Sequence, residues 1–395
     1  MKKILLIHNN YRETGGEDIA VQNEVSILKK YYEVETLFFS NKTKNYLTKS
    51  PLFFTSKNNN SAKQLLKAIE DFKPDVAYVH NTWFNASLSV FDILKDKNIK
   101  TILKLHNFRY FCTRTFFHKR HIRDNNVPMS DPLKVTSSYV CFACGQKINK
   151  LRFFNKYFIN SYLKSLMVIF YGKRYFKVLK DNDLKLLVLT EFHKNFLQNL
   201  GVQKEKITVF PNLINLKLEN VYSPESNYIV YAGRISEEKG IDELIKAFLD
   251  SNLNNLTLKI IGNGPSINSL KQKYIGKSVE FIDEISNADV LEIISKSKGV
   301  VTATKLYEGQ PTLLCEASTL GVPSFFPESG GITEFFPKDY VLSYKQFSYV
   351  DLRNKLKMLN NLEALSKQGK KNKEFISSYL DEKILIEKFN KVIDE

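Results

Sequence analysis

The stretch GVVTATKLYEGQPTLLCEAS, residues 299–318, holds the succession of elements on which the fold depends. Its apolar start is typical of a buried strand that ends near Thr302. Pro311 is suited to be the first residue of a helix, and Gly321 is suited to follow its last turn. The stretch therefore predicts a strand, a loop and a helix in that order.

The same succession recurs along the chain. Short apolar runs without alternation, each followed by a helical pattern, are typical of strands buried on both faces of parallel sheets. These runs are KILLIH, VETLFF, DVAYVH, TILKLH and KLLVLT, and later YIVYAG, LTLKIIG, VEFID and GVVTAT. We therefore predict an α/β protein with two doubly wound, Rossmann-like domains whose ligand sites face one cleft.

The chain of 395 residues is long enough for two domains, each with its own core. The segment at 210–225 has neither the helical nor the strand pattern of apolar residues, and it carries two prolines. It is therefore the predicted boundary between the two domains. The first domain is expected over residues 1–210 and the second over 226–375. Residues 376–395 are expected to form an amphipathic helix that packs back on the first domain.

Composition excludes several classes of protein. A hydrophobic content of 43% excludes a disordered chain, and no apolar run is long enough for a signal peptide or a membrane span. The four cysteines suit a reducing cytoplasm. The net charge of +16 implies an anionic partner, with a lysine- and asparagine-rich compositional bias as the alternative source of part of it. Among the partners, a phosphate-bearing substrate or an anionic lipid ranks above nucleic acid, because no zinc-finger spacing or RNP-like signature is present.

Residues 108–150 are expected to form a long functional loop, because they combine little periodicity with several turn formers. Cys112, Cys141 and Cys144 leave a zinc site and free thiols as alternatives; free thiols are favoured because no second Cys-x-x-Cys is present. Residues 151–180 alternate aromatic and basic residues, which suits either a membrane surface or a core-facing helix with a solvated lysine face.

Glu308 and Glu316 are the two acids of the opening stretch. Glu308 falls in the loop after the strand, where the helix dipole and free backbone N–H groups favour an anion. Glu316 lies one turn into the helix among apolar residues, where a carboxylate is costly unless it is paired. A ribose diol can supply two hydrogen bonds to it, although two solvated acids on a surface helix are the plainer alternative. The N–H groups belong to Gly309, Gln310 and Thr312.

Two more loops follow predicted strands in the second half. In YAGRISEEKG, Arg234 and Lys239 follow Gly233 and either neutralise a diphosphate or remain solvated cations. In IIGNGPSI, the Gly-x-Gly turn either lets a base or phosphate approach closely or is an ordinary tight turn. The glycines of that turn are Gly262 and Gly264.

The first domain has its own candidates. Gly15 and Gly16 precede the helix after the first strand, either as a plain helix start or as a loop that admits phosphate or acceptor. His106 and His80 end two strands, where a histidine can bind a sugar hydroxyl or serve in acid–base chemistry. Capping a loop is an equal alternative for His106 and the favoured one for His80.

Taken in order along nearly the whole chain, these motifs resemble the retaining family-four glycosyltransferases of GT-B fold, also described as glycosyltransferases group 1. The resemblance is carried by GRISEEKG, GNGP, YEGQPTLLCEAS followed by GVPSFFPESGG, and the Gly pair before the first helix. The Glu-x7-Glu element with the downstream Gly-Val-Pro is its most specific part. LHNFRYFC and the later cysteine pair are similar to a subgroup that assembles bacterial surface polysaccharides.

The resemblance implies retaining transfer of a hexosyl or related group from a nucleotide diphosphate donor, without a metal or other cofactor. It places Glu308 against the donor sugar and Glu316 on the ribose. Arg234 and Lys239 are implied to hold the diphosphate, and His106 to lie near the reacting centre; with Glu308 these three form the implied catalytic set. The other implied substrate-binding residues are Gly15, Gly16, Gly233, Gly262, Gly264, Gly309, Gln310, Pro311 and Thr312.

The implied partners are a UDP-sugar in preference to a GDP-sugar, a lipid-linked saccharide acceptor and the anionic inner surface of the membrane, without nucleic acid. The enzyme is expected to be cytoplasmic, attached peripherally to that membrane, and to build capsule, O-antigen or exopolysaccharide. Two alternatives stay open. One is another reaction on the same fold, such as that of a sugar-nucleotide epimerase or a sucrose-type synthase. The other is a catalytically degenerate copy that serves as an adaptor for another transferase.

Overall fold

The structure, a computed structural model, describes most of the chain. The described residues are 1–11, 15–41, 52, 55–108, 110, 171–172, 174–181, 183–214, 222, 224, 226–253 and 255–395, together with the backbone of two short paired strands, Val140–Cys141 and Gln146–Lys147. Most of the predicted loop at 108–150, with the side chains of its cysteine cluster, and most of the basic segment at 151–180 lie outside these residues.

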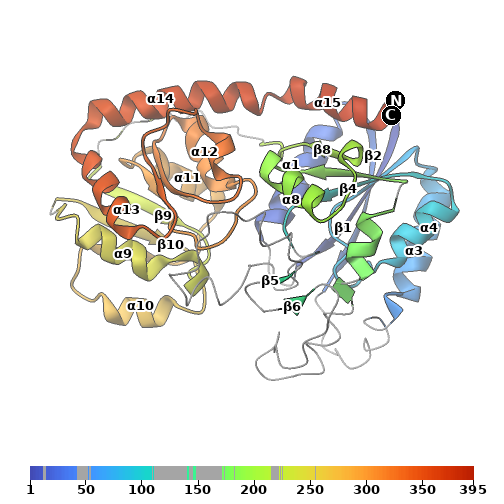
Figure 1. The fold of residues 1–395 in the computed structure, drawn as a ribbon, viewed down its shortest axis with the longest axis horizontal. Coiled ribbons are helices and arrows are strands. Elements are labelled where there is room, and N and C mark those ends of the chain that lie inside the picture. Colours follow the sequence, from blue (N-terminus) through green and yellow to red (C-terminus); the bar gives the residue numbers. More distant parts are fainter. Residues whose placement is uncertain are drawn as a thin grey trace. The chain divides into compact units, whose positions relative to one another are not determined.

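The chain divides into two compact units (Figure 1). The first unit comprises Met1–Asn215 with Glu382–Glu395, and the second unit comprises Leu216–Asp381. Each unit contains a six-stranded sheet in which every strand pair is parallel. The predicted α/β class with two doubly wound sheets is therefore confirmed.

The sheet of the first unit has the order β2-β1-β3-β4-β7-β8. Because β1 pairs with both β2 and β3, the chain changes direction across the sheet at β1, and ligands of open parallel sheets bind beyond the strand ends at such a point. The strands are β1 (Lys3–Asn10), β2 (Glu33–Ser40), β3 (Val76–Val79), β4 (Lys100–Leu105), β7 (Leu184–Val188) and β8 (Ile207–Val209). The helices are α1 (Gly16–Leu28), α3 (Asn59–Phe72), α4 (Ser89–Asp96), α8 (Glu191–Asn199) and α15 (Glu382–Asp394).

The sheet of the second unit has the order β11-β10-β9-β12-β13-β14, so its switch point lies between β9 and β12. Figure 1 shows α9 and α13 on one side of this sheet and α11, α12 and α14 on the other. The strands are β9 (Tyr228–Ala232), β10 (Thr257–Ile261), β11 (Val279–Ile282), β12 (Val300–Val301), β13 (Ser324–Glu328) and β14 (Ser343–Lys345). The helices are α9 (Ile241–Leu249), α10 (Ile267–Lys273), α11 (Asn287–Ser295), α12 (Thr312–Leu320), α13 (Tyr349–Leu356) and α14 (Leu362–Tyr379).

The C-terminal stretch is two helices, so the prediction of a single helix was wrong. The backbone leaves helical geometry at Leu380, with φ −106° and ψ 24°, and α15 begins two residues later. Helix α14 packs against α12 within the second unit, whereas α15 belongs to the first unit. Both chain ends lie side by side in Figure 1. The side chains of Lys2 and Asp394 form an ion pair there in the structure.

The ring of Phe389 anchors α15 in the core of the first unit. It is fully buried, and its centroid lies 5.1 Å from that of Tyr78, 5.5 Å from that of Phe210 and 5.9 Å from that of Tyr32. The hydroxyl of Tyr32 also donates to Oδ1 of Asn390 at 2.7 Å. The last helix is thus part of the first hydrophobic core.

We expect Phe389→Ala to lower the free energy of unfolding of the first unit by about 3–5 kcal/mol, because a buried ring is replaced by a cavity. Ile384→Ala, at an exposed position of the same helix, should change it by less than about 0.5 kcal/mol. Urea unfolding followed by the fluorescence of Trp83, the chain's single tryptophan, measures both variants. Equal effects of the two substitutions would contradict the docking of α15.

Candidate active site

The loops after β9 and β12 lie side by side at the switch point of the second sheet. The backbone N–H of Lys305 donates to the carbonyl of Glu238 at 2.9 Å. This contact brings Lys239, at the end of the first loop, beside Glu308 in the second. Two motifs that lie far apart in the sequence therefore form one group.

The carboxylate of Glu308 has two donors at Oε1. Nζ of Lys239 lies 2.6 Å away and Oγ1 of Thr304 lies 2.9 Å away. Burial by itself raises the pKa of this carboxyl, but the charge of Lys239 and the two hydrogen bonds lower the pKa overall. The backbone is fixed as well, because a Cβ atom on Gly330 would lie 2.4 Å from the carbonyl oxygen of Glu308. Glu308 is thus an ionised, positioned carboxylate.

Glu316 is buried on α12 with little to pair it. Its side chain is 5% exposed, and the hydrogen bond described for it comes from Nδ2 of Asn287 at a long 3.4 Å. Burial raises its pKa to about 7, with only the Asn287 hydrogen bond opposing the change. A buried carboxyl group with one weak donor is suited to receive hydrogen bonds from a ligand.

The helix that carries Glu316 starts one residue later than predicted. Pro311 is the N-cap, because its ψ of 83° is not helical, and the first helical residue is Thr312. Gly321 ends the helix with a left-handed φ of +82°, as predicted. Gly309 and Gln310 complete the turn between Glu308 and the helix, and Gln310 is buried.

Arg234 and the Gly-x-Gly turn differ in their surroundings. Arg234 follows Gly233 at the end of β9, is exposed, and makes no ion pair with the described residues. Gly262 and Gly264 instead face protein backbone, since Cβ atoms there would lie 2.2 Å from the carbonyl oxygens of Gly233 and Ile235. Close packing of two loops therefore accounts for these glycines, while the guanidinium is available to a ligand.

In the first unit, Asp18 organises the start of α1. Its carboxylate pairs with Nε2 of His8 at 2.9 Å and accepts the backbone N–H groups of Gly15 at 2.8 Å and Tyr11 at 3.2 Å. Burial raises the pKa of Asp18, but these hydrogen bonds lower it overall. Gly15 is the N-cap of α1 and Gly16 its first residue. The glycine pair therefore lies at the start of this helix.

His80 and His106 follow β3 and β4, which are neighbouring strands. Nδ1 of His80 lies 2.8 Å from Nε2 of His106, and the two rings stack with centroids 5.2 Å apart. Burial, with additional effects of nearby basic groups, lowers the pKa of both histidines well below the usual value. Both imidazoles are therefore neutral at pH 7.

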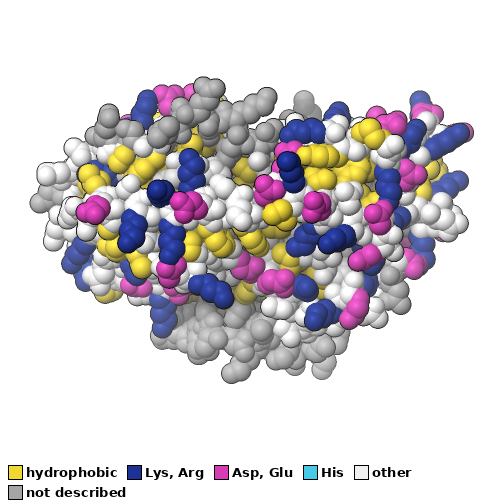
Figure 2. Space-filling model, turned by 90° about the horizontal axis from the view of Figure 1, so that it is seen from above, with side chains coloured by type: hydrophobic (Ala, Val, Ile, Leu, Met, Phe, Trp, Pro, Cys, Tyr) yellow, Lys and Arg dark blue, Asp and Glu magenta, His cyan; other side chains and the backbone are white. Residues whose placement is uncertain are grey.

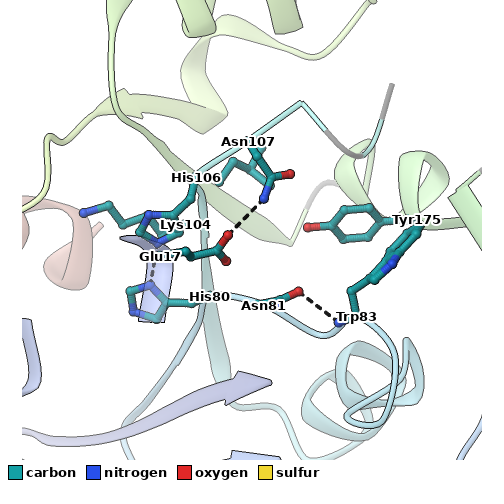
Figure 3. Close-up of a pocket in the computed structure, with 9 residues that line it drawn as sticks. Glu17, His80, Asn81, Trp83, Lys104, His106, Asn107 and Tyr175 are labelled. Carbon is teal, nitrogen blue, oxygen red and sulfur yellow. Dashed lines mark hydrogen bonds between the residues drawn. The ribbon is translucent and has the colours of Figure 1, made fainter. Parts of the chain in front are cut away.

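A pocket lies beside these histidines (Figure 3). Glu17 and His106 lie on one side of it, and Trp83 and Tyr175 lie on the other, with ring centroids 6.2 Å apart. Nδ2 of Asn107 donates to Oε2 of Glu17 at 3.0 Å. Carboxylate, amide and imidazole groups bind hydroxyls, and aromatic rings cover apolar faces.

Of the residues that line this pocket, only His80 and His106 were predicted from the sequence. Glu17 directly follows the glycine pair, and Asn107 follows His106, so their places beyond strand ends were the available signal. Trp83 lies three residues after His80, and Tyr175 comes from a segment nearly a hundred residues later. Only the packing of the first unit brings these four residues together.

Basic and acidic side chains are interspersed on the surface of the described residues. On the face drawn in Figure 2, coloured Lys and Arg side chains alternate with Asp and Glu side chains. Among the described residues, no helix is both long enough and apolar enough to cross a membrane. Within the same residues, no three His, Cys, Asp or Glu side chains are grouped to hold a metal ion.

We expect Glu316→Gln to raise the free energy of unfolding of the second unit at pH 8 but hardly at pH 5. The carboxyl titrates near 4.5 when exposed and near 7 in the folded unit, so its neutral form stabilises the fold at low pH. That stability is lost as the pH rises from 4.5 through 7, by at most about 3 kcal/mol. Gln keeps the neutral shape at every pH.

Urea unfolding followed by circular dichroism at both pH values measures this difference. Glu292→Gln is the matched control, because it replaces an exposed acid in the last turn of α11, the helix whose first residue is Asn287. This variant should show no such pH dependence. A gain from Glu316→Gln that is equal at pH 5 and pH 8 would contradict the raised pKa.

Comparison with known proteins places the second unit in a family. Residues 217–376 match the model of the family described as glycosyl transferases group 1. The amylovoran biosynthesis glycosyltransferase AmsD of Erwinia amylovora is 25% identical over 174 residues, which cover 41% of this chain and 48% of that protein. A lipopolysaccharide 1,2-N-acetylglucosaminetransferase of Salmonella typhimurium is 25% identical over 181 residues, or 40% and 47% of the two chains. The chain therefore spans about half the length of these relatives.

Solved structures extend the likeness of fold to the full chain. Anabaena Alr3699/HepE, determined in complex with UDP and glucose, matches with a TM-score of 0.64 and 14% identity, over 100% of both chains. The likeness of fold therefore covers both of the parallel sheets described above. Residues 217–376 thus form a domain of the glycosyl transferases group 1, and the chain as a whole has the GT-B fold.

Proposed function

We propose that this protein transfers a sugar from a UDP-sugar to a saccharide acceptor in the synthesis of a bacterial surface polysaccharide, with retention at the anomeric carbon. The observation that carries the proposal is Glu316, a buried carboxyl to which the described residues offer one weak donor, close in sequence to the paired carboxylate of Glu308. The names of the relatives in amylovoran and lipopolysaccharide synthesis support the product class.

The donor half of the proposal rests on the second unit. The two hydroxyls of a ribose would donate to the carboxylate of Glu316 and satisfy it. The guanidinium of Arg234, which has no ion pair among the described residues, and the ammonium of Lys239 would face the diphosphate. The N–H groups at the start of α12 would add partial positive charge. These groups can stabilise a departing diphosphate, whose charge grows as the bond to the sugar breaks.

The reaction we propose is attack on the face from which the diphosphate leaves. The bond between the anomeric carbon and the phosphate oxygen breaks, and the acceptor oxygen bonds to the same carbon on the same face. The acceptor proton passes to the departing phosphate oxygen. Glu308 would bind hydroxyls of the donor sugar, held in place by Lys239 and Thr304.

The acceptor half rests on the pocket of the first unit. Glu17 and Asn107 would bind sugar hydroxyls, while Trp83 and Tyr175 would cover the apolar face of a sugar ring. The neutral imidazole of His106 would bind the attacking hydroxyl. A lipid-linked acceptor and attachment to an anionic membrane surface agree with the net charge of +16.

We expect UDP to bind the protein with a Kd at least about tenfold lower than that of GDP. Glu316→Ala should weaken UDP binding by about 10–100-fold, since two hydrogen bonds to a charged group are lost. Isothermal titration calorimetry measures both, and Glu292→Ala serves as the control acid on the second unit. Equal UDP affinity in wild type and Glu316→Ala would remove Glu316 from the nucleotide site.

We expect Arg234→Ala to lower kcat by about 10²–10³-fold while changing donor affinity less than tenfold, because leaving-group charge develops in the transition state. The matched control is Lys296→Ala, which removes an exposed cation at the C-terminal end of α11. It should leave kcat and donor affinity unchanged. Release of UDP from a panel of UDP-sugars, with and without acceptor, provides the assay. Equal losses in kcat and affinity would indicate ground-state binding, and UDP binding without any release would favour the adaptor alternative.

A further inference from the structure

A buried group of polar side chains lies beneath the pocket of the first unit. Glu24 on α1, Tyr78 on β3 and Lys104 on β4 are all fully buried. Oε1 of Glu24 pairs with Nζ of Lys104, and Oε2 accepts the hydroxyl of Tyr78 at 3.0 Å. Nζ of Lys104 also donates to the carbonyl of Pro211 at 3.3 Å. The ion pair is therefore supported by further hydrogen bonds, which a buried pair requires.

The same carboxylate also acts on His80. Oε2 of Glu24 lies 3.7 Å from Nε2 of His80, too far for a good hydrogen bond but close enough for a strong electrostatic effect in a buried site. An N–H at Nε2 is attracted by a carboxylate at this distance, whereas a lone pair there is repelled. Glu24 therefore favours the tautomer of His80 that carries its proton on Nε2.

The tautomer of His80 decides that of His106. Nδ1 of His80 and Nε2 of His106 are 2.8 Å apart, so one proton lies between them. When His80 is protonated on Nε2, its Nδ1 can only accept. His106 must then carry its proton on Nε2, which leaves the lone pair of the neutral ring on Nδ1. His106 is the partly exposed member of the pair and lines the pocket.

We propose that Glu24 is a positioning residue. Through His80, it sets whether Nδ1 of His106 offers the pocket a lone pair or a proton. Its consequence for catalysis rests on the proposed function: the Nδ1 lone pair accepts the hydrogen bond of the attacking acceptor hydroxyl. Lys104 pairs with the same carboxylate. The other basic groups that act on the two rings, His8 and His193, come from β1 and α8.

The tautomers can be read without any substrate. Long-range 1H–15N correlation spectra of protein labelled at its six histidines distinguish protons on Nδ1 from protons on Nε2. His80→Gln and His106→Gln assign the two signals. At pH 7 we expect both rings to be neutral and protonated on Nε2. A wild-type His106 protonated on Nδ1 would overturn the proposal.

Variants separate positioning from support of the fold. Glu24→Gln leaves Lys104 buried and unpaired, which destabilises the unit, so Glu24→Gln with Lys104→Met neutralises both members. We expect this double variant to bind UDP as wild type does, since the nucleotide site lies in the second unit. Its His106 tautomers should become mixed, and kcat should fall by at least about tenfold with the KM for the donor unchanged.

Two results would contradict the proposal. Wild-type kcat and tautomers in the double variant would show that the buried pair supports only the fold. Unchanged tautomers with a reduced kcat would show that Glu24 acts by another route. Failure of the wild-type protein to bind UDP would instead reject the proposed function, and the spectra would still test the tautomer inference.

Discussion

Burying a carboxylate away from water is costly unless donors replace the water, and this constraint governs the candidate site in both units. Glu24 is fully buried with the ammonium of Lys104 and the hydroxyl of Tyr78 as partners. Glu308 is half-buried and held by Lys239 and Thr304. The number of protein donors that each carboxylate already has decides how many hydrogen bonds it can still accept from a ligand.

Glu316 is the exception to this pairing. Among the described residues it receives one long hydrogen bond, which leaves most of its accepting capacity unused there, and burial raises its pKa to about 7. A well-paired carboxylate such as Glu24 contributes to a defined internal geometry, whereas an under-paired one stores free energy that a ligand can release. The contrast between the two acids is the physical basis for assigning one to positioning and the other to ligand binding.

Parallel sheets bring such groups together because every strand ends at the same edge. Glu308 and Lys239 are 69 residues apart in sequence, and His80 and His106 are 26 apart, yet each pair is in direct contact beyond adjacent strand ends. The pocket of the first unit gathers its residues in the same way. A fold that repeats one strand–loop–helix unit can therefore build two separate sites from loops of modest length.

The sequence by itself determined the class of fold and much of the local structure. Unbroken apolar runs such as KILLIH and DVAYVH mark strands, and Gly321 marks a helix end, because burial periodicity and backbone preference are local properties. Strand β13 was missed, since Pro327 lies within it, and the short strands β8 and β14 have too few residues for a clear pattern. The tertiary structure alone decided the partners: Lys104 for Glu24, Lys239 for Glu308, and a pocket built from Glu17 and Trp83. Such contacts depend on strand order and on the packing of distant loops, which no local pattern encodes.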